Sequence, residues 1–191
     1  MSSGTTQRSQ LHPRIDELIE YLTEHRLRLH EEVAAVPPSL RERRPAPERW
    51  SVAEIVEHLS LVEQRVAELL TRRVTAARAT GAGPDPDTSS VVSTYVNPNA
   101  LVDRTTRISA PEPVRPTGTL DTTAGTEALV QSHAAMVSSL QNANGVNLTQ
   151  LTAKHPVFGP LNMYHWVVFL ALHDDRHAAQ IREIRQSLGA G

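Results

Sequence analysis

The chain has 191 residues, with 19 basic and 21 acidic side chains and a net charge of -2. This near-neutral charge argues against a general binder of nucleic acid or of anionic membranes, because both activities need an excess of basic residues. The absence of cysteine excludes disulfide bonds, thiolate metal sites and a cysteine nucleophile.

The first ten residues are polar and lack the apolar stretch of a signal peptide. We expect residues 1–10 to be disordered and residues 11–189 to form a single domain. No run approaches the roughly 20 apolar residues that span a bilayer. These features predict a cytoplasmic protein that does not enter the membrane.

Prolines divide the chain into helical windows. The 13 prolines leave four long proline-free windows at 14–36, 48–83, 117–155 and 161–191. Because proline is excluded from helix interiors, each window can hold one helix. Six prolines between positions 84 and 116 predict a long irregular connection between the second and third helices. That connection is either a crossover spanning the bundle or a flap.

The first two windows carry apolar residues at helical spacing. In the first window these residues are Ile15, Leu18, Leu22, Leu29, Val33 and Val36. The second helix should start at Ser51, whose side chain can form a capping box with Glu54. Its predicted inner stripe is Ile55, Leu59, Val62, Val66 and Leu69.

The third helix is predicted over about residues 126–140, with Leu129, Val137 and Leu140 facing inward. The fourth begins after Gly159-Pro160 and is followed by Gly189. No strand has comparable support, although residues 91–96 could pair locally. Four amphipathic helices of this length predict an all-α four-helix bundle.

Histidines lie on the inner faces of two of these helices. His58 follows Ile55 by three residues, so both lie on the same broad face of a helix. His173 and His177 are four residues apart and interrupt the apolar series of the last helix. Two inward imidazoles one turn apart can bind a divalent metal, and a third from a facing helix would complete a three-histidine site.

A His-x-x-x-His pair alone is weak evidence for metal, because exposed helical histidines are common. Its position on an apolar face, together with His58, strengthens the metal interpretation. A zincin protease would need glutamate directly after the first histidine, where this chain has Asp174. The spacing therefore disfavours a metalloprotease.

Four segments resemble the DinB/YfiT-like superfamily of metalloenzymes. The first is the run from Trp50 and Ser51 through Glu54 to His58. The second is the linker Ala110-Pro111-Glu112 with Pro116. The third is His155-Pro156 with Gly159-Pro160-Leu161, which resembles the start of the superfamily's last helix. The fourth is its His-x-x-Arg-His-x-x-Gln-Ile ending, formed here by His173, Arg176, His177, Gln180 and Ile181.

The resemblance implies an up-down-down-up bundle with one divalent metal ion, zinc or nickel, on His58, His173 and His177. It also implies a homodimer. Characterised relatives include S-transferases and isomerases that use bacillithiol, mycothiol or glutathione. The leading hypothesis is thus a metal-dependent S-transferase, in which a low-molecular-weight thiol reacts with a small-molecule electrophile.

Two other interpretations stay open. One is a hydrolase that uses metal-activated water, and the other is a non-catalytic, stress-induced bundle with a structural metal. Glu54 and His133 are further catalytic candidates. For Glu54 the capping role is favoured over a catalytic one, whereas His133 is either a substrate contact or a hydrogen-bonded core histidine. His155, before Pro156, is interpreted as loop structure.

Overall fold

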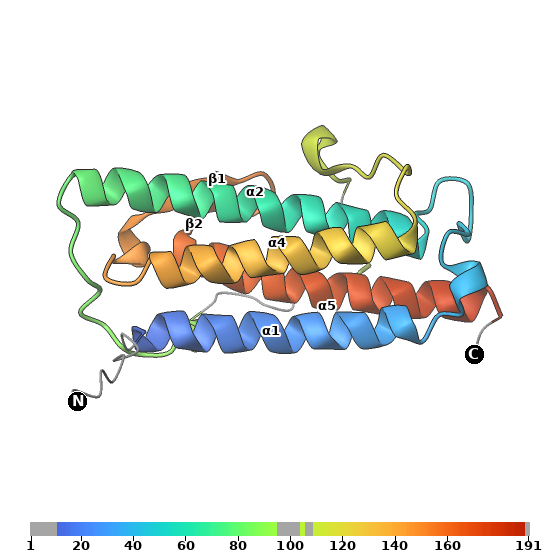
Figure 1. Ribbon diagram of the computed structural model, residues 1–191, viewed down its shortest axis with the longest axis horizontal. Coiled ribbons are helices and arrows are strands. Elements are labelled where there is room, and N and C mark those ends of the chain that lie inside the picture. The colour runs from blue at the N-terminus through green and yellow to red at the C-terminus, as the bar shows by residue number, and fades with distance from the viewer. Residues whose placement is uncertain (1–10, 95–103, 106–108, 190–191) are drawn as a thin grey trace, which may run out of the picture.

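The computed structural model describes residues 11–94, 104–105 and 109–189. Within these ranges, four long helices form the body of the molecule (Figure 1). They are α1 (Pro13–Ala34), α2 (Val52–Ala79), α4 (Thr122–Asn142) and α5 (Met163–Ser187). The all-α prediction is confirmed, while the segment predicted to be disordered, residues 1–10, lies outside the described ranges.

The helices run up-down-down-up. In Figure 1, α1 and α5 point in one direction and α2 and α4 in the other. The main packing pairs are α2 with α4 and α1 with α5. Since α2 ends at one end of the bundle and α4 starts at the other, the connection between them must cross its length. Its described parts contact α1 through Asp85 and α5 through Arg104, so the crossover interpretation is the correct one.

The helix starts follow local capping chemistry. Ser51 accepts a hydrogen bond from the backbone N–H of Glu54, and the Glu54 carboxylate accepts one from the Ser51 N–H. This confirms the predicted capping box. Helix α4 starts four residues earlier than predicted, because Asp121 caps it by accepting from the N–H of Ala124.

The predicted inward-facing residues of α2 and α4 are buried, except at one position in each helix, where the adjacent residue is buried instead. In α2, Leu70 is fully buried whereas Leu69 is only half-buried. In α4, Met136 is fully buried whereas Val137 is half-buried. Because one residue turns the helix by about 100°, neighbouring positions can exchange at the edge of a buried stripe.

A hairpin that the sequence reading missed precedes the last helix. Strands β1 (Thr152–His155) and β2 (Gly159–Asn162) pair antiparallel, with His155 opposite Gly159. The interpretation of His155 as loop structure was therefore wrong. Short 3₁₀ turns complete the secondary structure of the described segments, at Pro38–Leu40, Val92–Thr94, Glu112–Val114 and Leu148–Gln150. Residues 91–94 of the proposed 91–96 strand thus lie in or beside the turn at Val92–Thr94, and residues 95–96 lie outside the described ranges.

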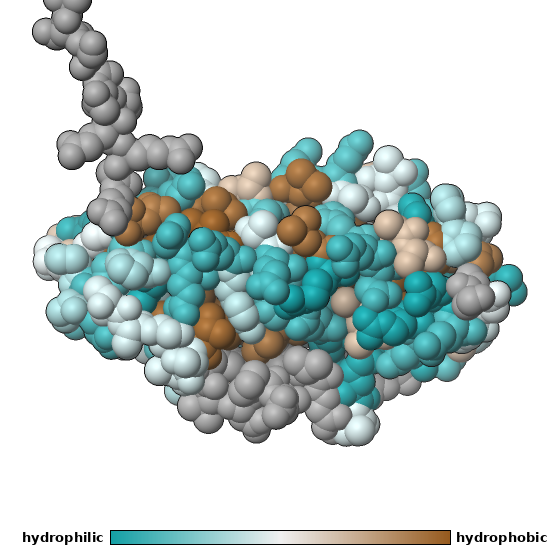
Figure 2. Space-filling model, turned by 90° about the horizontal axis from the view of Figure 1, so that it is seen from below, coloured by the Kyte–Doolittle hydropathy of each residue, from teal (hydrophilic) through white to brown (hydrophobic). Residues whose placement is uncertain are grey.

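The apolar core falls into two clusters along the bundle. One joins the first half of α1 to the second halves of α2 and α4 and the first half of α5. The other joins the opposite halves of α1, α2 and α5 to Leu129 of α4. On the face shown in Figure 2, hydrophilic residues predominate and apolar residues form separate patches. Among the described helices, none combines the length and apolarity needed to cross a membrane.

Candidate functional site

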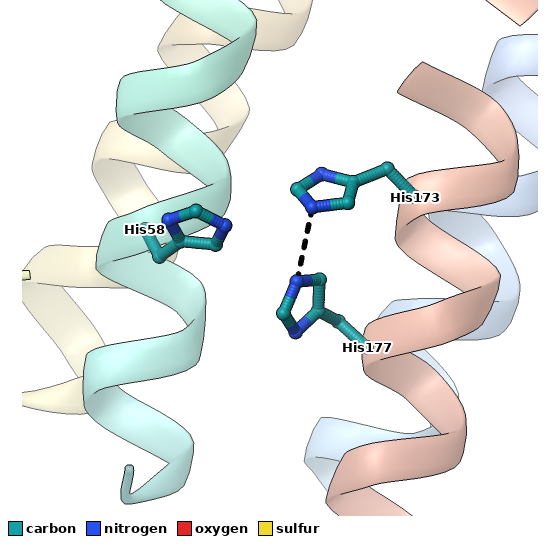
Figure 3. Close-up of side chains that lie close together, drawn as sticks. All are labelled: His58, His173 and His177. Atoms are coloured by element: carbon teal, nitrogen blue, oxygen red, sulfur yellow. Dashed lines mark hydrogen bonds between the residues drawn. The ribbon is translucent and has the colours of Figure 1, made fainter. Parts of the chain in front are cut away.

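Three histidines from two helices meet inside the bundle. His58 comes from α2, and His173 and His177 come from successive turns of α5, so their rings face one another (Figure 3). One ring nitrogen from each lies within 4.8 Å of the others. The Nε2 atoms of His173 and His177 are 3.1 Å apart. The structure thus brings together the three residues that the sequence singled out.

Hydrogen bonds fix two of these rings. The Nδ1–H of His58 donates to the Val114 carbonyl at 2.6 Å, and the Nδ1–H of His177 donates to Oε1 of Gln180 at 2.9 Å. In a neutral imidazole, a proton on Nδ1 leaves Nε2 with a free lone pair. The Nδ1 atom of His173 is buried and forms no hydrogen bond within the described chain.

Aromatic side chains support the rings from the sides. The Trp50 ring lies 4.9 Å from the His58 ring and stacks on His177 at 6.4 Å. Phe169 stacks on His173 at 5.2 Å between ring centroids. These contacts limit rotation of the imidazoles and hold their nitrogen atoms in one orientation.

All three imidazoles are neutral near pH 7. Burial lowers the pKa of His58 to about 4, against the opposing effect of the Val114 carbonyl. Burial also lowers the pKa values of His173 and His177 well below their ordinary range, and neighbouring positive charges lower them further. Since only neutral imidazole binds metal, the site is held in its ligating form.

The donor set fits one divalent ion. Two nitrogen ligands of a tetrahedral zinc ion, each about 2.0–2.1 Å from the metal, lie roughly 3.3 Å apart. The His173 and His177 nitrogens, 3.1 Å apart, are already close to this spacing. Three such ligands leave a fourth position for a substrate or water.

A cavity of about 910 Å³ adjoins the three histidines. One part of its wall is apolar and includes Trp50, Trp166 and Phe169. Among the described residues, the wall also contains five arginines, Arg49, Arg65, Arg104, Arg115 and Arg176, but only two glutamates, Glu48 and Glu183. Its described wall therefore carries a net positive formal charge, although the whole chain is slightly acidic.

The linker before α4, which includes residues 109–118, forms one side of the cavity and is hydrogen-bonded to α2. Arg65 donates to the Pro113 carbonyl at 3.1 Å, next to the carbonyl that orients His58. Glu57 is buried and precedes His58 in the sequence. Its carboxylate accepts hydrogen bonds from the backbone N–H groups of Thr117 and Gly118. Helix α2 thus positions both a histidine and the backbone that orients it.

The two catalytic candidates lie elsewhere. Glu54 is held by the cap and by an ion pair with Arg44, and it does not line the described cavity. His133 contacts the buried carboxylate of Glu63 at 3.3 Å and also lies outside the described cavity wall. The geometry favours the structural interpretation of both residues.

The structure contains a buried network of charged side chains that was not predicted from the sequence. Arg26 donates to Asp174 at 2.8 Å and to Glu63 at 3.1 Å, and all three side chains are almost fully buried. Burial raises the pKa of Asp174 to about 6 despite the opposing attraction of Arg26. The sequence signal for this network was the appearance of charged residues at apolar positions of α1, α2 and α5.

Comparison with known proteins places these features in a family. A family model described as the DinB superfamily matches residues 21–181. The chain belongs to the DinB superfamily. It is also 23% identical over 171 residues to the uncharacterized protein YuaE of Bacillus subtilis (strain 168), covering 86% of this chain and 95% of that protein. No solved structure matches it.

Proposed function

We propose that this DinB superfamily protein is a metal-dependent enzyme that joins a low-molecular-weight thiol to a small electrophile. His58, His173 and His177 would hold one divalent ion, for which we propose zinc or nickel, since imidazole ligands suit both. The observation that carries the proposal is the convergence of three neutral imidazoles at the wall of a 910 Å³ cavity. A purely structural site would be closed by protein ligands, so the cavity supports the enzyme over the non-catalytic bundle.

A divalent ion at this site would favour the thiolate form of a thiol at its open position. The thiol must come from outside, because the chain has no cysteine. Cavity arginines such as Arg104 add positive charge that favours an anionic cosubstrate. The apolar wall around Trp166 and Phe169 would bind the organic part of the electrophile and exclude water.

Homodimerisation and a cytoplasmic location remain predictions. Gel filtration with light scattering would give the mass directly, and a mass of about one 21.0 kDa chain would contradict the dimer.

The function is tested on untagged protein, since metal-affinity columns can load nickel into a three-histidine site. Metal content is measured first. Glutathione, bacillithiol and mycothiol are then each supplied with 1-chloro-2,4-dinitrobenzene as a general electrophile. We expect conjugate formation that requires one of these thiols and stops when the protein is stripped of metal.

Two variants sharpen the test. His177→Ala should abolish thiol transfer, whereas His165→Ala, which removes a histidine of the same helix outside the described cavity wall, should retain it. Hydrolysis of p-nitrophenyl acetate at the same rate with and without thiol would favour the hydrolase. Equal conjugate formation by the metal-free protein would refute metal dependence.

A further inference from the structure

His155 is a fourth histidine in the described cavity wall, separate from the three that converge. It ends strand β1 and is 6% exposed. Its ring packs against Phe158 and Trp166 at 4.9 Å and against Phe169 at 4.5 Å between centroids. Phe169 also stacks on His173, so one aromatic ring contacts both His155 and the candidate metal site.

The hairpin turn fixes the tautomer of His155. The backbone N–H groups of Val157 and Phe158 both donate to its Nδ1, at 3.1 and 3.2 Å. An imidazole nitrogen that accepts hydrogen bonds carries no proton, so the proton of the neutral ring must be on Nε2. Burial lowers the pKa of His155 to about 4, which keeps the ring neutral at physiological pH.

His155 lines the cavity, and its Nε2–H group is the one polar atom of the ring that the turn does not occupy. It has no hydrogen-bond partner in the described part of the chain, and it is not among the enclosed atoms that lack one. It is therefore the reachable polar atom of a side chain that is otherwise enclosed by aromatic rings. A buried donor normally has a partner, and here the cavity is the place from which a partner can come.

We propose that His155 is a ligand-recognition residue whose Nε2–H donates a hydrogen bond to an oxygen atom of the molecule bound in the cavity. The aromatic neighbours define the rest of that molecule as an apolar body next to a carbonyl or carboxylate oxygen. This recognition requires no metal. In the proposed S-transferase reaction this molecule is the electrophile rather than the thiol, and only that assignment rests on the proposed function.

The first test is the tautomer itself. Long-range ¹H–¹⁵N spectra of metal-free, ¹⁵N-labelled protein at pH 7 should show His155 neutral, with its proton on Nε2. A protonated ring, or a proton on Nδ1, would overturn the proposal. This measurement needs no variant, so it stands even if substitution at His155 prevents folding.

The second test compares two probes of the same shape. Cyclohexanone carries the acceptor oxygen, whereas methylenecyclohexane replaces the oxygen with a methylene group. Their dissociation constants are measured by NMR titration of metal-free wild-type protein and of His155→Asn. The asparagine oxygen can still accept from the two backbone N–H groups, but the outward N–H is lost.

We expect His155→Asn to weaken cyclohexanone binding by about three- to tenfold, the size of one net hydrogen bond, with little change for methylenecyclohexane. An equal change for both probes would indicate a packing role and overturn the proposal. Because both tests use metal-free protein without thiol, their failure is distinct from failure of the S-transferase assay.

Discussion

Zinc should stabilise the folded protein through the three histidines, and burial should preserve this effect at unusually low pH. An exposed histidine site loses metal as pH falls through the ordinary pKa of ~6.5, because protons compete for the same nitrogens. The pKa of His58 is instead lowered to about 4, and those of His173 and His177 are lowered well below the ordinary value. Protons should therefore displace the metal only well below pH 6.5, and should compete at His58 only near pH 4.

The magnitude follows from linkage. A folded-state pKa below the unfolded value means that the neutral histidine stabilises the fold above pH ~6.5, and that this contribution is lost as pH falls toward the folded-state pKa. For His58, the shift from 6.5 to about 4 corresponds to about 3 kcal/mol. Zinc at about 100 times its dissociation constant adds roughly 2.7 kcal/mol, which for a chain of this size raises the melting temperature by about 5–10 °C.

The assay is differential scanning calorimetry of metal-free protein with and without added zinc, at pH 7.5 and pH 5.5. Wild type and the control His165→Ala should show similar zinc responses at both pH values. His177→Ala should lose most of the response, because two imidazoles hold zinc far more weakly than three. An undiminished response in the His58→Ala, His173→Ala and His177→Ala variants would refute the site. If wild-type protein is folded at pH 5.5 but zinc no longer raises its melting temperature, burial does not keep the three histidines neutral at that pH.

Three further predictions concern stability and partners. Ser51→Ala should reduce the free energy of unfolding in urea by about 1 kcal/mol, through loss of the α2 cap, without changing the zinc response. Arg26→Met should cost about 3–5 kcal/mol in the same assay, because Glu63 and Asp174 lose the cation between them, and a cost below about 1 kcal/mol would contradict the buried network. Random duplex DNA should not bind at physiological salt in a fluorescence anisotropy titration, and micromolar binding that weakens steeply with salt would disprove this.

The features that local sequence predicts well are those with local causes. Proline positions, helical spacing and the Ser51–Glu54 box depend on neighbours within one or two turns, so the four helices and their inner faces could be derived from them. The same periodicity placed His58 inward, and it is 4% exposed. The start of α4 was missed only because the cap at Asp121 was not recognised.

The hairpin could not be derived in this way, because Pro156 and Pro160 argue against strands. Contacts with the start of α5 stabilise it instead. The N–H of Met163 donates to the Leu151 carbonyl, and the Trp166 indole N–H donates to the Ala153 carbonyl. The role of His155 depends on this tertiary arrangement, as does the Val114 carbonyl that orients His58 from a residue 56 positions away.

The charged network and the three histidines lie at the same level of the bundle, between the two apolar clusters. Arg26 of α1 contacts Asp174 of α5, Glu63 of α2 and the Leu129 carbonyl of α4, so one side chain links all four helices. Asp174 follows His173 in the chain but points toward α1, whereas His173 points toward α2.

This arrangement explains why α5 can carry polar groups on two faces in the middle of a core. The Arg26 ion pairs fix α5 against α1, which leaves the histidine face of the same turn directed at α2 and the cavity. Such buried charges add little net stability by themselves, because desolvation offsets their attraction. The apolar clusters on either side must therefore supply the stability of the fold. The charged network between them holds the three histidines in a fixed position.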